Sequence, residues 1–352
     1  MLFMTITLTD FTLTIVHISL KNPFITALRR VDDAVAVRLE LFDESGRRGI
    51  GEAPPTVAIT GESLEDIRNS LQNVLLPPLL HKPLTMEEAQ RLLHERLCGH
   101  TSAKACLDIA LHDLFAQKAE IPLWRYLGAG EPSGVETAVT VSLEAPETMG
   151  KRTQDFLRKG LDILKVKVGG GDGKDFQRIR AVREAAPDAT ILVDANQAWE
   201  EKEALRLIET IAPLGIELIE QPLKAEDMAG MRRLTAESPI PILADESAFT
   251  LAQVREIIET EAAHMVNVKL MKCGGLAKAK EILAWCESNG VECMMGSMLE
   301  TPASIEAAIH LATVFPRTIR YTDLDSPLLY EKLPEKCGVA VSGNRLRLKE
   351  PQ

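Results

Sequence analysis

The chain has 352 residues, which is long enough for a barrel-sized domain and a smaller second domain. With 45% hydrophobic and 26% charged residues, its composition is typical of a soluble globular protein. The net charge of −11 makes nucleic acid and anionic membranes unfavourable general partners. No apolar run is long enough to span a bilayer, and the N-terminus lacks the basic segment of a signal peptide, so we expect a cytoplasmic protein with no membrane association.

Cysteine and histidine spacing argues against a zinc site. The six cysteines form no C-x-x-C pair, and the seven histidines form no H-E-x-x-H motif. Reduced thiols in an intracellular protein are therefore expected.

Residues 1–128 predict an α+β capping domain. Strand-like composition covers Ile6–Ser19, Ala34–Phe42 and Gly49–Glu52. Two connections, residues 21–30 and 53–61, separate these strands. Helix-start signals follow at Ser63 and Thr85, and Ser102–Lys118 has one apolar face. Residues 128–134 form the expected boundary.

Residues 135–325 contain eight short apolar runs, which start roughly every 23 to 27 residues. Segments with helical spacing, such as Lys202–Ile211 and Leu251–Glu259, separate them. This alternation predicts a closed parallel α/β barrel. The runs are Glu136–Leu143, Ile163–Gly169, Thr190–Asn196, Glu217–Pro222, Pro241–Glu246, His264–Leu270, Val291–Ser297 and Thr318–Leu324.

The tail, residues 326–352, is too short for a further βα unit. Val339–Ser342 and Arg345–Leu348 predict a hairpin around Gly343-Asn344. We expect this tail to return to the capping domain.

Three successive runs end in a carboxylate, namely Asp194, Glu220 and Asp245. The carboxyl ends of barrel strands meet at one mouth, where these groups would repel one another without a cation between them. Oxygen ligands suit Mg²⁺, with Mn²⁺ as a substitute. The alternative is that each acid is a satisfied rim residue or a helix cap.

Lysines end two further runs. Lys165 and Lys167 alternate with Val166, so both point to the same side of their strand, the barrel interior. Lys269 lies roughly across the mouth, and Lys272 is expected on the loop that follows. Opposed lysines beside a metal favour removal of a proton next to a carboxylate and its return on the opposite face. A structural ion pair is the alternative for Lys269.

The ordered motifs K-V-K at 165–167, D-A-N-Q at 194–197, E-Q-P at 220–222, A-D-E-S at 244–247 and N-V-K-L-M-K at 267–272 resemble the enolase superfamily. More narrowly, they resemble its muconate-lactonizing-enzyme subgroup. The resemblance implies a modified TIM barrel, (β/α)7β, with a capping domain built from both termini. It also implies one Mg²⁺ per subunit on the three acids, Lys167 and Lys269 as the acid/base pair, and Lys165 near the substrate carboxylate.

The eighth run is similar to that of dipeptide epimerases, where a D-x-D pair such as Asp323 and Asp325 binds the N-terminal amine. The sequence Gly296-Ser297-Met298-Leu299-Glu300-Thr301 matches the same family, which places Ser297 and Met298 near the substrate. A helix cap or a solvated turn is the alternative for the two aspartates.

The capping connections resemble those of epimerases that act on L-Ala-D/L-Glu. This resemblance implies that Arg29 pairs with the glutamate side chain, that Phe24 and Ile59 close over the substrate, and that Thr140 makes a polar contact. An exposed position next to Arg30 is the alternative for Arg29.

These features predict an isomerase, a Mg²⁺-dependent dipeptide epimerase of murein-peptide recycling with a small-molecule dipeptide as its partner. Alternatives within the subgroup are a cycloisomerase, an o-succinylbenzoate synthase and an N-acylamino acid racemase. A barrel hydrolase with two carboxylates and a non-catalytic binding protein are alternatives of other classes. The sequence leaves open whether the chain forms a homo-oligomer.

Overall fold

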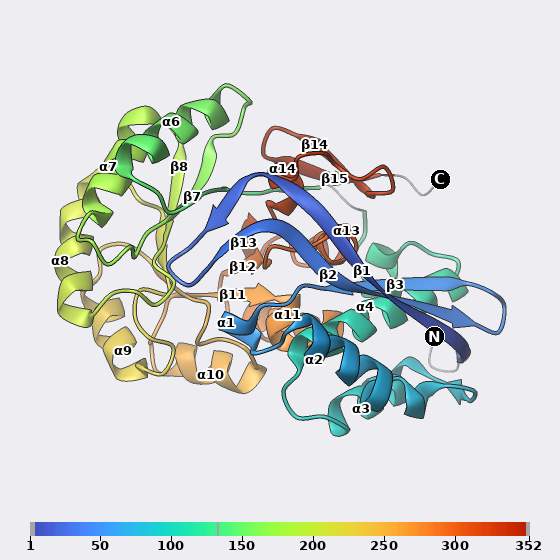
Figure 1. The fold of residues 1–352 in the computed structure, drawn as a ribbon. Helices are drawn as coiled ribbons and strands as arrows, with labels where there is room; N and C mark the ends of the chain where they lie inside the picture. The colour runs from blue at the N-terminus through green and yellow to red at the C-terminus, as the bar shows by residue number, and fades with distance from the viewer. Residues whose placement is uncertain (1–3, 132–133, 350–352) are drawn as a thin grey trace.

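The structure is a computed structural model that describes residues 4–131 and 134–349. Within these residues, an antiparallel sheet with its helices lies against a parallel barrel (Figure 1). Residues 1–3 of the expected N-terminal segment, residues 132 and 133 of the expected boundary, and residues 350–352 of the expected tail lie outside the described part.

Eight parallel strands form the barrel in strict chain order, which confirms the predicted fold class. A bridge between Thr137 and Thr322 joins the first strand region to the last, and the Ala138 amide donates to the Thr322 carbonyl at 2.9 Å. The strands are β6 (Val139–Val141), β7 (Ile163–Lys167), β8 (Thr190–Asp194), β9 (Leu218–Glu220), β10 (Ile242–Ala244), β11 (Met265–Lys269), β12 (Cys293–Gly296) and β13 (Ile319–Asp323).

Helices surround the barrel, and α6 to α10 form a continuous arc in Figure 1. In α8, Ala204, Ile208 and Ile211 recur at helical spacing and are buried, which explains its orientation. The last strand is followed only by a four-residue helix, as a (β/α)7β barrel requires. The helices are α6 (Pro146–Leu157), α7 (Asp175–Ala185), α8 (Glu201–Ile211), η3 (Ala212–Leu214), α9 (Met228–Glu237), α10 (Leu251–Glu259), α11 (Leu270–Cys273), α12 (Leu276–Ser288), α13 (Pro302–Ala312) and α14 (Ser326–Leu329).

The run at 136–143 does not form the single strand that the sequence predicted. Its start belongs to β5 (Val135–Glu136), which pairs antiparallel with β15 (Arg345–Leu348), and only β6 joins the barrel. The predicted hairpin is present, because β14 (Val339–Ser342) pairs with β15. The tail also contacts the capping sheet, where the Glu331 amide donates to the Ser19 carbonyl at 2.7 Å.

The capping sheet has the order β3-β2-β1-β4, with β1 (Ile6–Ile25), β2 (Arg30–Asp43), β3 (Arg48–Ala53) and β4 (Pro83–Leu84). Strand β1 was expected to end at Ser19. It continues because, after an irregularity in register, Phe24 pairs with Val31 and Ile25 with Arg30. Figure 1 shows β1 reaching over to the barrel, where the Leu143 amide donates to the Ile25 carbonyl at 2.9 Å.

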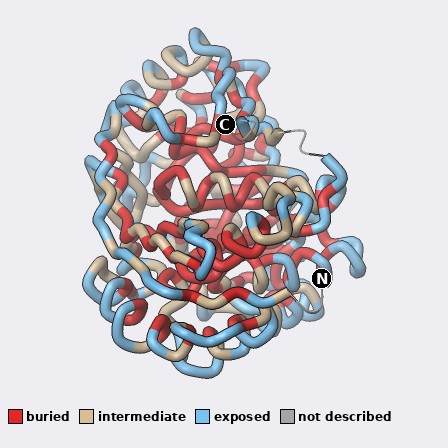
Figure 2. Tube along the Cα trace, turned by 90° about the vertical axis from the view of Figure 1, so that its right-hand side faces the viewer, coloured by how far each residue is buried: buried red, intermediate tan, exposed pale blue. Residues whose placement is uncertain are grey.

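Two capping helices, α2 and α3, start where the sequence predicted. Ser63 with Asp66 and Thr85 with Glu88 form capping boxes at α2 and α3. Helix α4 differs from the prediction, because 14 of its 18 residues are buried rather than one face. It lies between the capping sheet and the barrel helices. Figure 2 shows that the buried residues of the molecule gather in its interior. The helices are α1 (Val57–Thr60), α2 (Leu64–Asn69), η1 (Ser70–Leu75), η2 (Pro77–Leu79), α3 (Met86–Glu95), α4 (Thr101–Lys118) and α5 (Leu123–Leu127).

All six cysteines are free thiols. Among the helices of residues 4–131 and 134–349, none has the length and apolar character needed to cross a membrane.

Candidate active site

The strand register places the polar residues of the sequence motifs at one end of the barrel. Lys167 is the register partner of Asp194, and Asp194 is the partner of Glu220. On the other side of the barrel, Lys269 is level with Gly296, and Gly296 with Asp323. The carboxyl ends of the parallel strands thus bring these side chains to a common mouth.

Lys165 lies at the centre of this group, with 1% of its surface exposed. Its Nζ is 2.7 Å from Asp323 Oδ2, 2.7 Å from Glu220 Oε2 and 3.0 Å from Asp194 Oδ2. Burial alone would lower the pKa of Lys165, but Asp194 and Asp323 raise that pKa well above its ordinary value. Lys165 is therefore a fixed cation among three acids.

Lys167 and Lys269 approach the mouth from strands that three other strands separate. Lys167 Nζ is 2.5 Å from Asp194 Oδ2 and 6.0 Å from the centre of the Phe24 ring. Lys269 Nζ is 2.6 Å from Asp245 Oδ2 and 4.0 Å from Glu220 Oε1. Burial alone would lower the pKa of Lys269, but Asp245 raises it above its ordinary value.

The three predicted metal ligands are buried, and their carboxyl groups differ in pKa. Burial raises the pKa of Glu220 to about 7, and the charge of Asp194 acts in the same direction. For Asp194, burial is outweighed by Lys165 and Lys167, which lower the pKa to about 2. Lys269 and Lys272 likewise lower the pKa of Asp245.

The charges at the mouth do not balance, because six carboxyl groups face four lysines. The excess of negative charge raises the pKa of two buried acids. Burial and the charge of Asp245 raise the pKa of Glu246 to about 8, and burial and the charge of Asp323 raise the pKa of Asp325 to about 6. A divalent cation would offset this excess of acidic groups. The set comprises Asp194, Glu220, Asp245, Glu246, Asp323 and Asp325 with Lys165, Lys167, Lys269 and Lys272.

The donor atoms also suit Mg²⁺. Glu220 Oε2 is buried and accepts no hydrogen bond, since Lys165 contacts it without hydrogen-bond geometry, and Asn196 Oδ1 is likewise unpartnered. Among the described side chains, no three Asp, Glu, His or Cys residues are grouped as a set of metal ligands. The ammonium groups of Lys165 and Lys269 lie between the carboxylates instead. Buried oxygens with excess negative charge fit a hard divalent ion.

A small cavity of about 50 Å³ opens above these groups. Lys167, Lys269 and Asp245 line it, whereas Lys165, Asp194 and Glu220 lie outside its wall. Every residue for which the sequence predicted another substrate contact also lines it, namely Phe24, Arg29, Ile59, Thr140, Ser297, Met298, Asp323 and Asp325.

Asp323 and Asp325 are both buried, which excludes a solvated turn. Asp325 precedes α14 but makes no side-chain capping hydrogen bond. Its Oδ2 accepts a hydrogen bond from the Thr140 amide at 2.7 Å, and Ser297 Oγ donates to the Asp323 carbonyl at 3.0 Å. Both aspartates line the cavity, and these hydrogen bonds to the backbone hold them in position.

Arg29 is half-buried, and burial lowers the pKa of its guanidinium. It donates to the Pro55 carbonyl at 3.5 Å and forms no ion pair within the described residues. Its neighbour Arg30 is exposed and pairs with Asp32 at 3.2 Å. Of these two arginines, Arg29 is therefore the one whose guanidinium has no carboxylate partner among the described residues and can bind an anionic ligand.

The expectation that Lys272 lies on a loop was wrong. Lys272 is on α11, with 1% of its surface exposed, because one helical turn after Lys269 directs it back toward β10. Its Nζ donates to Asp245 Oδ1 at 2.6 Å, to the Asp245 carbonyl at 2.6 Å and to the Asn267 carbonyl at 2.8 Å. The three-residue spacing from Lys269 was the available signal.

Two amide side chains at the mouth were also missed. Asn267 Nδ2 donates to Glu220 Oε1 at 2.8 Å. Gln221 has a φ of 34°, and its Oε1 accepts from the Asp245 amide at 2.9 Å. Gln221 belongs to the E-Q-P motif and Asn267 to the N-V-K-L-M-K motif, in which only the charged residues were predicted to act.

A parallel barrel with a capping domain over its lysine- and carboxylate-bearing mouth defines a class of barrel enzyme. Two family models match the chain: "Mandelate racemase / muconate lactonizing enzyme, N-terminal domain" over residues 9–128 and "Enolase C-terminal domain-like" over residues 148–350. The chain belongs to the mandelate racemase / muconate lactonizing enzyme family of the enolase superfamily, and it is an isomerase of the epimerase and racemase class.

Similar proteins include the L-amino acid-D/L-Glu epimerase of Sulfurimonas denitrificans, which is 42% identical over 330 residues, 94% of this chain and 96% of that protein. The L-Ala-D/L-Glu epimerase of Bacillus subtilis, solved with a substrate, has a TM-score of 0.94 at 39% identity, covering 97% of this chain and 96% of the other. The dipeptide epimerase of Enterococcus faecalis, solved with Mg and L-Leu-L-Tyr, has a TM-score of 0.92 at 34% identity, covering 98% and 97%.

Proposed function

We propose that the protein is a Mg²⁺-dependent dipeptide epimerase that inverts the α-carbon of the C-terminal residue, with L-Ala-D/L-Glu as the preferred pair. The observation that carries the proposal is that Lys167 and Lys269 line one cavity from separate strands. Inversion needs a proton acceptor on one face of a carbon and a proton donor on the other. The similar proteins described above support the same reaction.

In this reaction one lysine, as the neutral amine, accepts the α-proton, and the other, as ammonium, donates a proton to the opposite face. The two exchange roles in the reverse direction. Asp194, Glu220 and Asp245 would hold Mg²⁺, which when bound supplies positive charge that stabilises the negative charge developing beside the substrate carboxylate. Lys165, held by Asp194 and Asp323, adds a fixed positive charge to the same region.

The charged residues that line the cavity suit a dipeptide with an acidic side chain. Asp323 and Asp325 would bind its ammonium group, and the unpaired guanidinium of Arg29 would bind the side-chain carboxylate. Phe24, Ile59 and Met298 would exclude water, while Ser297 and Thr140 would make polar contacts; these residues all line the cavity.

We infer a cytoplasmic role in murein-peptide recycling, where Ala-Glu peptides are the substrate. Six free thiols support a reducing compartment.

The test is to incubate L-Ala-L-Glu with the enzyme and Mg²⁺ in deuterated water. The expected result is inversion with uptake of one deuterium at the glutamate α-carbon. Lys167→Ala and Lys269→Ala should each lower inversion by about 10² to 10⁴-fold, while exchange continues from one diastereomer. Lys202→Ala, on the exposed face of α8, is the matched control.

Exchange without inversion in the unaltered protein would contradict the two-base assignment. Hydrolysis that survives chelation of the metal would instead support a carboxylate-dependent barrel hydrolase. Titration calorimetry with Mg²⁺ tests the metal separately, and Asp194→Asn should weaken the measured binding.

A further inference from the structure

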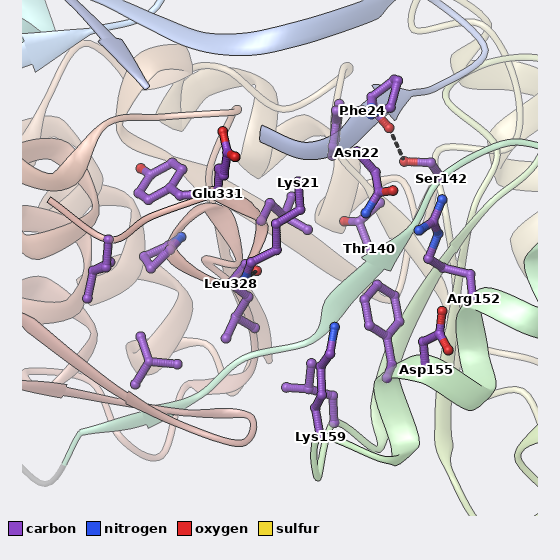
Figure 3. Close-up of a pocket in the computed structure, with 18 of the residues that line it drawn as sticks. Lys21, Asn22, Phe24, Thr140, Ser142, Arg152, Asp155, Lys159, Leu328 and Glu331 are labelled. Carbon is purple, nitrogen blue, oxygen red and sulfur yellow. Dashed lines mark hydrogen bonds between the residues drawn. The ribbon is translucent and has the colours of Figure 1, made fainter. Parts of the chain in front are cut away.

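A second cavity, of about 340 Å³, lies beside the small one. Figure 3 shows Lys21, Asn22 and Phe24 of β1 on one side of it, with Thr140, Arg152 and Lys159 of the first βα unit on another. The tail after β13 and the β14–β15 hairpin complete the wall. Because β1, the first βα unit and the C-terminal tail with its hairpin are distant in sequence, the cavity is a product of the fold.

Two lysines in this wall have no counter-ion. Lys21 Nζ donates to the Leu328 carbonyl at 3.0 Å, and neither Lys21 nor Lys159 forms an ion pair in the part of the chain that the structure describes. Burial and the neighbouring charge of Lys159 lower the pKa of Lys21. Two like charges thus face the same space.

The acids of the wall do not neutralise this pair. Glu144 lies 3.6 Å from Arg152, and Asp155 pairs with Arg158. Glu331 forms no ion pair among the described residues, and Figure 3 shows its carboxylate pointing away from Lys159. With Glu144 and Asp155 paired, two unpaired lysines exceed one unpaired acid, and the cavity keeps a net positive charge that favours a bound anion.

Much of the remaining wall is apolar. Phe156, Leu161 and Leu333 contribute to it, and Val341 leaves 37% of its surface exposed. Exposed apolar surface inside a concave site is stabilised when a hydrocarbon group covers it. The wall thus combines a surface for an alkyl or aryl group with a binding point for an anion.

We propose that this cavity is a second binding site, which takes a small carboxylate with an apolar chain. Lys21 and Lys159 bind the carboxylate, and the chain lies against Phe156, Leu161 and Val341. Phe24 lines both cavities, and its ring is 6.0 Å from Lys167 Nζ. An occupant of the second site therefore contacts a wall of the candidate active site.

Titration calorimetry with octanoate tests this site in the full chain. Saturable binding at millimolar concentration is expected, and octylamine should not compete. Lys21→Met and Lys159→Met should each weaken binding about threefold, and together about tenfold, as for partly exposed ion pairs. Lys151→Met, exposed on α6 shortly before Lys159 and absent from the cavity wall, is the matched control and should bind octanoate normally.

Val341→Trp provides an independent variant, because it fills the cavity from an exposed position on the hairpin. It should abolish octanoate binding while the thermal midpoint stays close to that of the unaltered protein. The proposal is overturned if octanoate affinity is unchanged in Lys21→Met, Lys159→Met and Val341→Trp, or if the unaltered protein shows no saturable binding. Since binding is measured without turnover, failure of the epimerase assignment would leave this result unchanged.

Discussion

Lys165 Nζ of β7 lies 2.7 Å from Asp323 Oδ2 of β13, so a lysine near the start of the barrel holds an acid on its last strand. Asp323 is thus a buried acid with a lysine partner. We expect Asp323→Asn to lower kcat/KM for L-Ala-L-Glu by about 10- to 100-fold, because a charge-assisted contact to the substrate ammonium is lost. The N-acetyl dipeptide, which lacks that ammonium, should be affected much less. An equal loss for both substrates would assign Asp323 a structural role only.

Arg29 decides the side-chain preference if its guanidinium is free to bind an anion. Arg29→Leu should lower kcat/KM for L-Ala-L-Glu by about 10- to 100-fold and raise it for L-Ala-L-Leu. Arg30→Leu is the control, because Arg30 is adjacent, exposed and paired with Asp32. The measurement is a paired kinetic comparison of both dipeptides with all three proteins. Unchanged preference in Arg29→Leu would remove Arg29 from the substrate site.

Lys272 Nζ donates hydrogen bonds to both the carboxylate and the backbone carbonyl of Asp245. Lys272→Met should destabilise the protein by about 1 to 3 kcal/mol, because the buried Asp245 Oδ1 loses a charge-assisted hydrogen bond while Lys269 still pairs with Oδ2. It should also weaken Mg²⁺ binding, since Asp245 is no longer fixed. Denaturant unfolding and calorimetry measure the two effects. Lys278→Met, on an exposed face of α12, should change neither, and normal Mg²⁺ affinity in Lys272→Met would limit Lys272 to stability.

Glu306 predicts a dependence of stability on pH. Burial raises its pKa from 4.5 to about 7, so the folded protein binds this proton more tightly than the unfolded chain does. The stabilisation is complete below about pH 4.5 and is lost as the pH rises through about 7. Glu306→Gln should therefore remove up to about 3 kcal/mol of the fall in unfolding free energy between pH 4.5 and 8. Urea titrations at several pH values measure it, with exposed Glu287→Gln as control; parallel curves for Glu306→Gln and the unaltered protein would refute the assignment.

Local sequence patterns were sufficient for most of the barrel. A buried parallel strand needs only a short apolar run, and a polar residue at its end marks the mouth, so Asp194, Glu220 and Asp245 could be placed from spacing alone. The capping boxes at Ser63 and Thr85 are equally local. For this reason the strand order and the gathering of the charged residues could be predicted.

Long-range pairing set the limits of that prediction. The run at 136–143 is interrupted because β15, two hundred residues later, takes Val135 and Glu136 as partners. Strand β1 extends to Ile25 because Val31 returns alongside Phe24. The cavity beside Lys21 likewise depends on segments that no local pattern connects.

Strand β1 and neighbouring capping segments reach the mouth of the barrel, so two parts of the polypeptide contribute different residues to the site. The amines and acids proposed for chemistry lie on barrel strands or directly after one, whereas Phe24, Arg29 and Ile59 come from the capping part. Mutations in a few surface residues of the cap can then redirect the enzyme toward new peptides while its reactive centre stays intact. Because the two sets of residues are separate, substrate specificity can change through single substitutions in the cap, each of which leaves the enzyme active.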